Sequence, residues 1–210
     1  MSITADRRTH WEKVYQGKAP TEVSWYQPHL ALSLELIAET GIDQSATIID
    51  VGGGTSTLVD DLLAKGYTHI CVLDISAAAI AQAQARLHER AALVEWIEAD
   101  ITQAELRREF YDLWHDRAVF HFLTDPDDRA RYVGKLERSL KPGGHLIIAT
   151  FSLEAPPRCS GLEVMRYSPA TLHAQIGRGF ELVRSLTEAH RTPSGKSQNF
   201  IYCHFRKQQA

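Results

Sequence analysis

The sequence predicts an α/β fold of the Rossmann-like three-layer type, in which helices cover both faces of a seven-stranded, mostly parallel sheet that ends in an antiparallel hairpin. Three observations predict it. Short apolar runs alternate with helical patterns from residue 47 to residue 151, an alternation typical of parallel sheets. The glycine turn Gly52-Gly53-Gly54 joins the first apolar run to the first of these helices. The last two apolar runs flank a turn, as in a hairpin.

Composition restricts the class of protein. The 210 residues are 44% hydrophobic and 23% charged, which predicts one globular domain over residues 1–210. The net charge of −3 includes no run of basic residues, so we do not expect nucleic acid as a partner. No apolar stretch reaches the ~20 residues of a membrane span, and the first eight residues lack the apolar core of a signal peptide. We therefore expect a cytoplasmic protein without a membrane partner. Whether it is a monomer or a dimer does not follow from the sequence.

The N-terminal segment, residues 1–27, is rich in aromatic side chains. Trp11 and Tyr15 are four residues apart, so on a helix they share a face. Together with Trp25 they could cover a ligand, by stacking on a flat ring or by a cation–π contact of about 0.5–2 kcal/mol. Alternatively, the rings only fix the segment to the core. Both interpretations stay open.

A helix is expected over residues 28–40, ahead of the first strand. Apolar residues at positions 30, 34 and 37 have helical spacing. Pro28 stands in its expected first turn, and Gly41 comes just after its end.

The glycine turn after the first strand is the centre of the predicted site. Residues 47–51 form the strand, and leucine spacing predicts a helix over 58–66. Glycines let backbone N–H groups approach a ligand, and a helix N-terminus favours electron-rich groups. A dinucleotide-binding turn needs another glycine where this chain has Ser56 and Thr57. Asp50, beside the turn, would repel a pyrophosphate and attract a cation, so we expect a nucleotide-like ligand that is not a dinucleotide.

The next two strands also end in acids. Residues 67–74 form a strand that ends in Asp74, which is placed to accept two hydrogen bonds from ribose hydroxyls. Ser76 can cap the helix over 77–89. A third strand, 93–101, brings Asp100 to the same edge, where it can accept a hydrogen bond from an adenine amino group. The residues that follow these acids, Ile75 and Ile101, would be flat apolar walls around the base.

The second half of the sheet continues the alternation. The stretch 111–123 is predicted to be a fourth strand that runs into a loop, with His121 just past the strand. A helix begins at Pro126 with an apolar stripe that includes Tyr132 and Leu136. Residues 145–151 form the fifth strand. The loop 152–167 has the length and position of a lid. A short helix then begins at Pro169, and strands over 180–186 and 199–205 form the hairpin.

Five short motifs follow one another through this alternation. Each is common alone, but all five in this order form a specific pattern. They are Asp50-Val51-Gly52-Gly53-Gly54, Leu73-Asp74, Ala99-Asp100, Tyr111-Asp112-Leu113 leading to Phe120-His121-Phe122-Leu123, and Leu140-Lys141-Pro142-Gly143-Gly144.

With these motifs the chain resembles the class I S-adenosylmethionine-dependent methyltransferases, and its hairpin is similar to their reversed seventh strand. The resemblance implies S-adenosyl-L-methionine as cofactor, S-adenosyl-L-homocysteine as product, and no metal. It implies that the glycine turn contacts the cofactor, that Asp74 binds ribose and Asp100 adenine, and that His115 and Asp116 contact the methionine end. The predicted cofactor site consists of Trp11, Tyr15, Trp25, Asp50, Gly52, Gly53, Gly54, Asp74, Ile75, Asp100, Ile101, His115 and Asp116.

Two details of the resemblance bear on its limits. Ser56 stands where many members have a third glycine, and serine is frequent enough there that we do not interpret it as a loss of binding. The segment Trp11-x-x-x-Tyr15-x-Gly17-Lys18 resembles the N-terminus of thiopurine-type and related small-molecule methyltransferases. It also resembles that of small protein lysine methyltransferases, so it does not choose the acceptor.

Methyl transfer from a sulfonium is an in-line displacement, so the enzyme mainly has to orient the reactants and exclude water. A base is needed only for a protonated acceptor, and His121 is the candidate because its ordinary pKa is near neutral. Alternatively, His121 fills the interface between sheet and helix, and Asp116 with Arg117 forms a structural ion pair. The predicted substrate contacts are Tyr26, Arg117, His121, Arg158, Cys159 and Arg166. An anionic acceptor would explain the arginines of the loop, Arg158 and Arg166, as would ordinary solvation.

The sequence therefore favours a methyltransferase with a small-molecule acceptor. A protein lysine methyltransferase is the alternative and should show an acidic open groove beside the site. An NAD-dependent oxidoreductase is disfavoured by Asp50 and by the incomplete glycine pattern. A non-catalytic cofactor-binding module is the fourth possibility.

Overall fold

The computed structural model describes residues 3–209. Residues 1, 2 and 210, which belong to the predicted domain, lie outside the described residues, and residues 1 and 2 also belong to the predicted N-terminal segment. The division of the chain into one domain stays a prediction. The main strands are β1 (Thr47–Val51), β2 (His69–Asp74), β3 (Val94–Glu98), β4 (Tyr111–Arg117), β5 (Leu140–Phe151), β8 (Phe180–Arg191) and β9 (Ser197–Lys207).

Six α-helices are described in residues 3–209, together with short 3₁₀ turns at 20–22, 88–93 and 120–122. None of the described helices is long and apolar enough to cross a membrane. The α-helices are α1 (Ile3–Gly17), α2 (Ala31–Glu39), α3 (Leu58–Ala64), α4 (Ala77–Leu87), α5 (Pro126–Ser139) and α6 (Pro169–Ile176).

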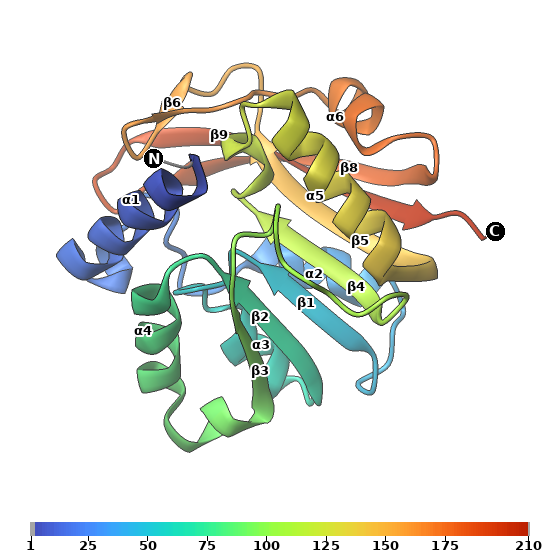
Figure 1. The fold of residues 1–210 in the computed structure, drawn as a ribbon, viewed down its shortest axis with the longest axis horizontal. Coiled ribbons are helices and arrows are strands. Elements are labelled where there is room, and N and C mark those ends of the chain that lie inside the picture. Colours follow the sequence, from blue (N-terminus) through green and yellow to red (C-terminus); the bar gives the residue numbers. More distant parts are fainter. Residues whose placement is uncertain (1–2, 210) are drawn as a thin grey trace.

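The seven strands form one sheet in the order β3-β2-β1-β4-β5-β9-β8. The first five are parallel, and β9 runs antiparallel to both β5 and β8. Helices lie on both faces of the sheet (Figure 1). The predicted Rossmann-like fold with an antiparallel closing hairpin is therefore confirmed.

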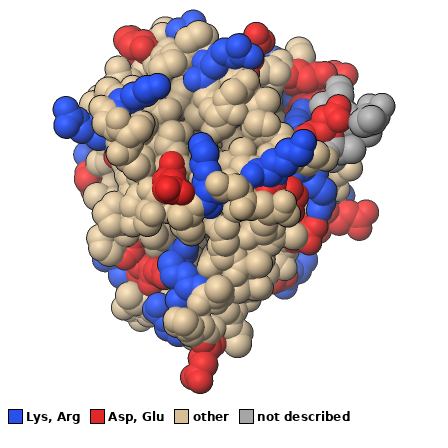
Figure 2. Space-filling view, turned by 90° about the vertical axis from the view of Figure 1, so that its left-hand side faces the viewer, with Lys and Arg blue, Asp and Glu red and all other residues tan. Residues whose placement is uncertain are grey.

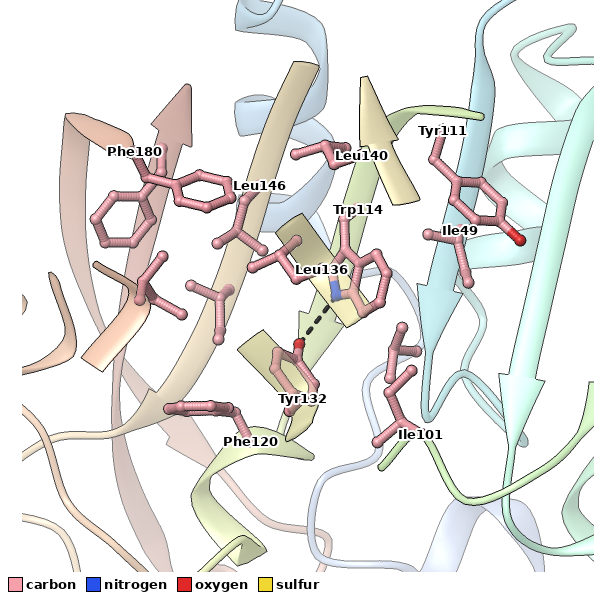
Figure 3. Packing of buried hydrophobic residues seen from close by; sticks show 14 of the residues in the cluster. Ile49, Ile101, Tyr111, Trp114, Phe120, Tyr132, Leu136, Leu140, Leu146 and Phe180 are labelled. Atoms are coloured by element: carbon pink, nitrogen blue, oxygen red, sulfur yellow. Dashed lines mark hydrogen bonds between the residues drawn. The ribbon is translucent and has the colours of Figure 1, made fainter. Parts of the chain in front are cut away.

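Each face of the sheet has its own apolar core, because side chains alternate between faces along a strand. Ile49 and Trp114 face α5 and α6. Figure 3 shows this core, in which Trp114 Nε1 donates a hydrogen bond of 2.9 Å to the hydroxyl of Tyr132 from α5. Ile48 and Leu113 face α2, α3 and α4 in the second core. The alternation decides which strand residues can reach the site described below.

Several local predictions hold. The Ser76 hydroxyl accepts a hydrogen bond of 3.1 Å from the Ala79 N–H and so caps α4. Asp125 caps α5, with Pro126 in its first turn. Gly41 follows α2 with φ of +72°, a conformation that glycine adopts without strain.

One boundary was wrong. The helix predicted over 28–40 begins only at Ala31, because the preceding residues run along the site, where the Gln27 carbonyl accepts a hydrogen bond of 3.0 Å from the Thr57 hydroxyl. The stretch 111–123 passes from strand into loop as predicted: the strand ends at Arg117, since Ala118 has φ of +73° and turns the chain.

The predicted lid loop, 152–167, is more ordered in its hydrogen bonding than its sequence indicates. It contains a small hairpin of β6 (Arg158–Cys159) and β7 (Leu162–Glu163). Arg166 donates hydrogen bonds of 3.0 and 3.1 Å to the carbonyls of Leu153 and Ala155. The loop lies on the same side of the molecule as α1 (Figure 1).

Candidate active site

A pocket opens at the carboxyl ends of β1, β2 and β4, the edge at which open α/β sheets bind ligands. It encloses about 1060 Å³ of space between atoms, a volume that includes open solvent at its mouth. We call α1 and residues 20–30, which cover it, the roof. The pocket is lined by the predicted site residues Trp11, Tyr15, Trp25, Tyr26, Asp50, Gly52, Asp74, Ile75, Asp100, Ile101, His115 and Arg117.

Asp50, the acid beside the glycine turn, is buried, and only one of its two carboxylate oxygens has a hydrogen-bond partner among the described residues. Its Oδ1 accepts a hydrogen bond of 2.7 Å from His115 Nδ1. The other ring nitrogen of His115 lies 2.9 Å from the hydroxyl of Ser33, which fixes the ring. Asp50 Oδ2 is buried and has no hydrogen-bond partner among the described residues. A buried carboxylate oxygen without a partner is costly, so it marks a place for a ligand's donor group.

The backbone N–H groups of the glycine turn donate hydrogen bonds to other groups of the protein. The Gly52 and Gly53 N–H groups donate to the Leu73 carbonyl at 2.7 and 3.3 Å, and the Gly54 N–H donates to Asp74 Oδ2 at 3.0 Å. The expectation that these groups would be presented to a ligand is therefore wrong.

The glycines are instead required for close packing. A Cβ on Gly53 would lie 2.7 Å from the carboxyl carbon of Asp50, and a Cβ on Gly54 would lie 2.5 Å from Asp74 Oδ2. Only glycine at these two positions lets both carboxylates reach the pocket wall. Gly53 and Gly54 themselves are not among the lining residues.

Asp74 lies at the end of β2 with its carboxylate buried. The N–H groups of Gly54 and Ser76 donate to its two oxygens at 3.0 and 2.9 Å. Burial nevertheless raises the pKa of Asp74 to about 7, an effect that the negative charge of Asp50 reinforces. The side chain is therefore ready to accept donors that favour its ionised form.

Asp100, at the end of the segment after β3, is held by its own turn and by the roof. Its Oδ1 accepts hydrogen bonds of 2.8 Å from both the N–H and the hydroxyl of Thr102. Its Oδ2 lies 3.4 Å from Arg7 Nη1, and Arg7 also forms an ion pair with Asp128 of α5. This arginine of α1 lines the pocket as well.

The roof is an aromatic cluster attached to the domain by polar contacts. The ring of Trp11 lies 5.7 Å from that of Trp25 and 4.9 Å from that of Phe122. Glu12 accepts a hydrogen bond of 2.6 Å from the Ala77 N–H at the start of α4. Aromatic faces of this kind can contact a base or a cation.

Comparison with known proteins agrees with this geometry. Residues 49–148 match the model of a family described as a methyltransferase domain. This match over just under half of the chain, together with the fold, supports a class I S-adenosylmethionine-dependent methyltransferase. The chain is 27% identical over 144 residues to the "eEF1A lysine and N-terminal methyltransferase" of Mus musculus, a match over 66% of this chain and 20% of that protein. It therefore spans about a fifth of the length of that relative.

Two further matches cover nearly the whole methyltransferase. The "EEF1A lysine methyltransferase 2" of Homo sapiens is 22% identical over 209 residues, which are 92% of this chain and 82% of that protein. The crystal structure of a 1,6-didemethyltoxoflavin-N1-methyltransferase of Burkholderia thailandensis, which contains 1,6-didemethyltoxoflavin and S-adenosylhomocysteine, superimposes with a TM-score of 0.71 at 17% identity over 100% of this chain and 92% of that one.

Asp116 does not line the pocket of this methyltransferase, contrary to expectation. Neighbouring residues of a strand point to opposite faces, so Asp116 points away from His115 and toward α5. It accepts hydrogen bonds of 2.6 Å from the Tyr132 hydroxyl and 2.9 Å from the Val119 N–H. Burial raises the pKa of Asp116 to about 6. The proposed Asp116–Arg117 ion pair is also wrong, because Arg117 binds other groups on the opposite face.

His121 lies outside the set of lining residues and is fully buried. Its Nδ1 accepts a hydrogen bond of 3.2 Å from the Phe151 N–H, and its ring packs against Phe122 and Phe151 at 4.5 and 4.7 Å. Burial lowers the pKa of His121 to about 3. The near-neutral pKa on which its catalytic role was predicted is therefore absent, and the alternative of a packing histidine describes what is observed.

The three predicted contacts from the loop 152–167 also lie outside the lining residues. Arg158 is exposed and donates to the Gly161 carbonyl at 3.3 Å. Arg166 holds the loop together as described above. Cys159 is buried with its Sγ 4.0 Å from the Ser24 hydroxyl, and burial raises the pKa of its thiol. These residues shape the loop that lies beside the roof.

Sequence reasoning missed several lining residues. Arg7 could have been found, because it precedes Trp11 and Tyr15 at four-residue spacing and therefore shares their helical face. Val119 and Gln27 gave no comparable signal, since loop residues have no periodicity. In the described part of the chain, no three His, Cys, Asp or Glu side chains come together in a way that could hold a metal ion.

Proposed function

We propose that this chain binds S-adenosyl-L-methionine in the pocket and transfers its methyl group to a small molecule. The observation that carries the proposal is the free Oδ2 of Asp50. Next to a turn whose N–H groups donate to Leu73 and Asp74, the chain presents a buried anionic acceptor. A pyrophosphate would need the opposite arrangement, with free N–H donors and no carboxylate.

The residues present fit this cofactor. Asp50 Oδ2 would accept a hydrogen bond from the ammonium group, and Asp74 would accept hydrogen bonds from the ribose hydroxyls. Asp100 would face the adenine amino group, with Ile75 and Ile101 against the base. When bound, the cofactor supplies a methyl group on a positively charged sulfonium, and such a cation is favoured near carboxylates and aromatic faces.

The chain's own contribution to methyl transfer is orientation and exclusion of water. His115 holds Asp50 at the sheet, so the ammonium site has a fixed position. Trp11, Trp25 and Phe122 pack together over the pocket, which keeps water from the reacting groups. Placing two reactants in line supplies much of the rate enhancement for such a displacement.

A protein lysine is the second candidate acceptor, favoured by the names of the two relatives. We expected an acidic open groove for that function. On the face that carries α1, Figure 2 shows Lys and Arg interspersed with Asp and Glu. The covered pocket and this mixed surface support the small-molecule acceptor.

Calorimetric titration tests the proposal. We expect S-adenosylhomocysteine to bind and NAD not to bind, and we expect Asp50→Asn to weaken S-adenosylhomocysteine by roughly 10- to 100-fold, because a charged hydrogen-bond partner is lost. Asp43→Asn, at an exposed acid outside the pocket, is the matched control and should bind like the wild type. Binding of NAD alone would overturn the assignment. Transfer of labelled methyl to a lysine-containing peptide, and to none of a panel of thiols, amines and carboxylates, would favour the second candidate.

A further inference from the structure

Arg117, the last residue of β4, is the one cation among the described lining residues that comes from the sheet. Its side chain is only 5% exposed. Its Nε donates a hydrogen bond of 2.8 Å to the Tyr202 hydroxyl, and its Nη1 donates one of 2.8 Å to the Trp25 carbonyl. The guanidinium also lies over the Phe200 ring, 4.8 Å from its centre. These contacts fix the guanidinium in one orientation.

The remaining nitrogen of this guanidinium is buried and unsatisfied. Nη2 has no hydrogen-bond partner among the described residues. The nearest carboxylate oxygen, Glu188 Oε2, is 3.6 Å away, too far for a hydrogen bond. That carboxylate already accepts hydrogen bonds of 2.7 Å from Gln27 Nε2 and 3.0 Å from the Tyr202 hydroxyl. A buried charged donor left without a partner is costly unless a ligand satisfies it.

We propose that Arg117 Nη2 binds a carboxylate, or another singly charged oxyanion, of the methyl acceptor. This inference rests on the proposed function and gives its acceptor a chemical class. Arg117 and His115 are two residues apart on β4 and so share a face, separated by roughly 6.6 Å along the strand. Because His115 holds Asp50, the anion subsite lies beside the place assigned to the cofactor's ammonium group.

The charges around Arg117 decide between acceptor classes. A lysine side chain would bring a second cation to a buried guanidinium, where repulsion is poorly screened. A phosphate dianion would meet the carboxylate of Glu188 at the same nitrogen. A monoanion meets the same carboxylate with half the charge of a dianion, so Glu188 repels it less.

Simple probes can test the subsite without the natural acceptor. With protein saturated by S-adenosylhomocysteine, calorimetry would compare benzoate with benzamide, benzylammonium and inorganic phosphate. We expect benzoate to bind roughly tenfold or more tightly than benzamide, since an oxyanion strengthens the hydrogen bond to arginine. Benzylammonium and phosphate should bind more weakly than benzoate.

Four variants separate recognition from folding. Arg117→Gln should lose the preference for benzoate, and Glu188→Gln should strengthen benzoate binding because a competing negative charge is removed. The double variant R117Q/E188Q leaves no unpaired buried charge, so it controls for misfolding and should also lose the preference. Arg108→Gln changes an exposed arginine outside the pocket and should retain it.

The contrary outcomes are distinct. No benzoate binding, equal affinity for benzoate and benzamide, tighter benzylammonium or phosphate, or a benzoate preference that survives in R117Q/E188Q would each overturn this inference. Failure of S-adenosylhomocysteine to bind in the first titration would overturn the proposed function instead. If S-adenosylhomocysteine bound and benzoate did not, only the proposed anion subsite would be overturned.

Discussion

At the scale of single residues, burial rather than hydrogen bonding sets the ionisation of Asp74. Two backbone N–H groups stabilise its carboxylate, yet its pKa is raised to about 7. Donors from a ligand would favour the ionised form. Ionisation of the buried Asp74 carboxyl therefore costs free energy near neutral pH, and hydrogen bonds from the proposed ligand would lower that cost.

His121 leads to a prediction on stability. Its pKa is about 3 in the folded protein, below the ordinary 6.5. Between these two pH values the imidazole is protonated in the unfolded chain and neutral in the folded chain. Its contribution to stability is therefore complete above pH 6.5 and falls as the pH drops toward 3, by at most about 1.4 kcal/mol per pH unit. His121→Asn keeps an acceptor for the Phe151 N–H, and we expect it to flatten the pH dependence of urea unfolding between about pH 6 and pH 4.

The control for that measurement is His88→Asn. His88 is exposed at the end of α4, so its replacement removes no buried ring. This variant should keep the wild-type slope. An unchanged slope in His121→Asn would show that the buried ring takes up a proton without unfolding.

At the scale of elements, the glycine turn joins two roles in one short segment. It ends β1, and it leaves space for the carboxylates of Asp50 and Asp74. The backbone of the turn is used internally, so its contribution to a ligand site is to bring acids close together. That differs from a turn whose N–H groups bind phosphate.

Two glycine substitutions should therefore act in opposite directions. In Gly53→Ala the new Cβ would lie 2.7 Å from the carboxyl carbon of Asp50. We expect a loss of about 1–3 kcal/mol in the free energy of unfolding from this overpacking, with weaker S-adenosylhomocysteine binding. Gly134→Ala, in the exposed middle of α5 with nothing within 4 Å of the new Cβ, should gain about 0.5–1 kcal/mol through helix propensity.

Urea unfolding and calorimetry on the two variants check this prediction. Gly134→Ala also serves as the matched control for binding, because it lies outside the pocket. If Gly53→Ala bound S-adenosylhomocysteine like the wild type, the position of Asp50 would not depend on the space that Gly53 leaves.

At the scale of the whole molecule, the site is assembled from segments that are distant in sequence. The roof comes from α1 and residues 20–30, and the acids come from the ends of β1, β2 and the segment after β3. The partners of Arg117 come from the roof, β8 and β9. Ligand binding should therefore change amide exchange most in the roof, which covers the pocket without belonging to the sheet.

Hydrogen exchange measures that coupling. On addition of S-adenosylhomocysteine, we expect slower exchange of the α1 amides and of the residues after β1 and β2, because a ligand stabilises the closed state that it contacts. The amides of residues 180–184, at the far end of β8, are the internal control and should not change. Protection confined to the control, or absent from α1, would contradict a covering role for the roof.

Features of the fold and site that depend on local sequence patterns were predictable, and features that depend on tertiary packing were not. Strand ends and the order of acids were predictable because alternation and spacing place Asp50, Asp74 and Asp100 at one edge. The role of the turn's N–H groups was not, since their partner at Leu73 belongs to another strand. The side of the sheet reached by Asp116 could have been predicted from strand alternation alone. The neighbours of Arg117 depend on tertiary packing that no local pattern contains.

The position of α1 has a practical consequence for handling the protein. Figure 1 shows the beginning of α1 and the end of β9 on opposite sides of the molecule, and Arg7 of α1 lines the pocket. A purification tag ahead of α1 would therefore start from a helix that lines the pocket. A tag after residue 210 would sit away from it, so kinetic work should begin with that fusion.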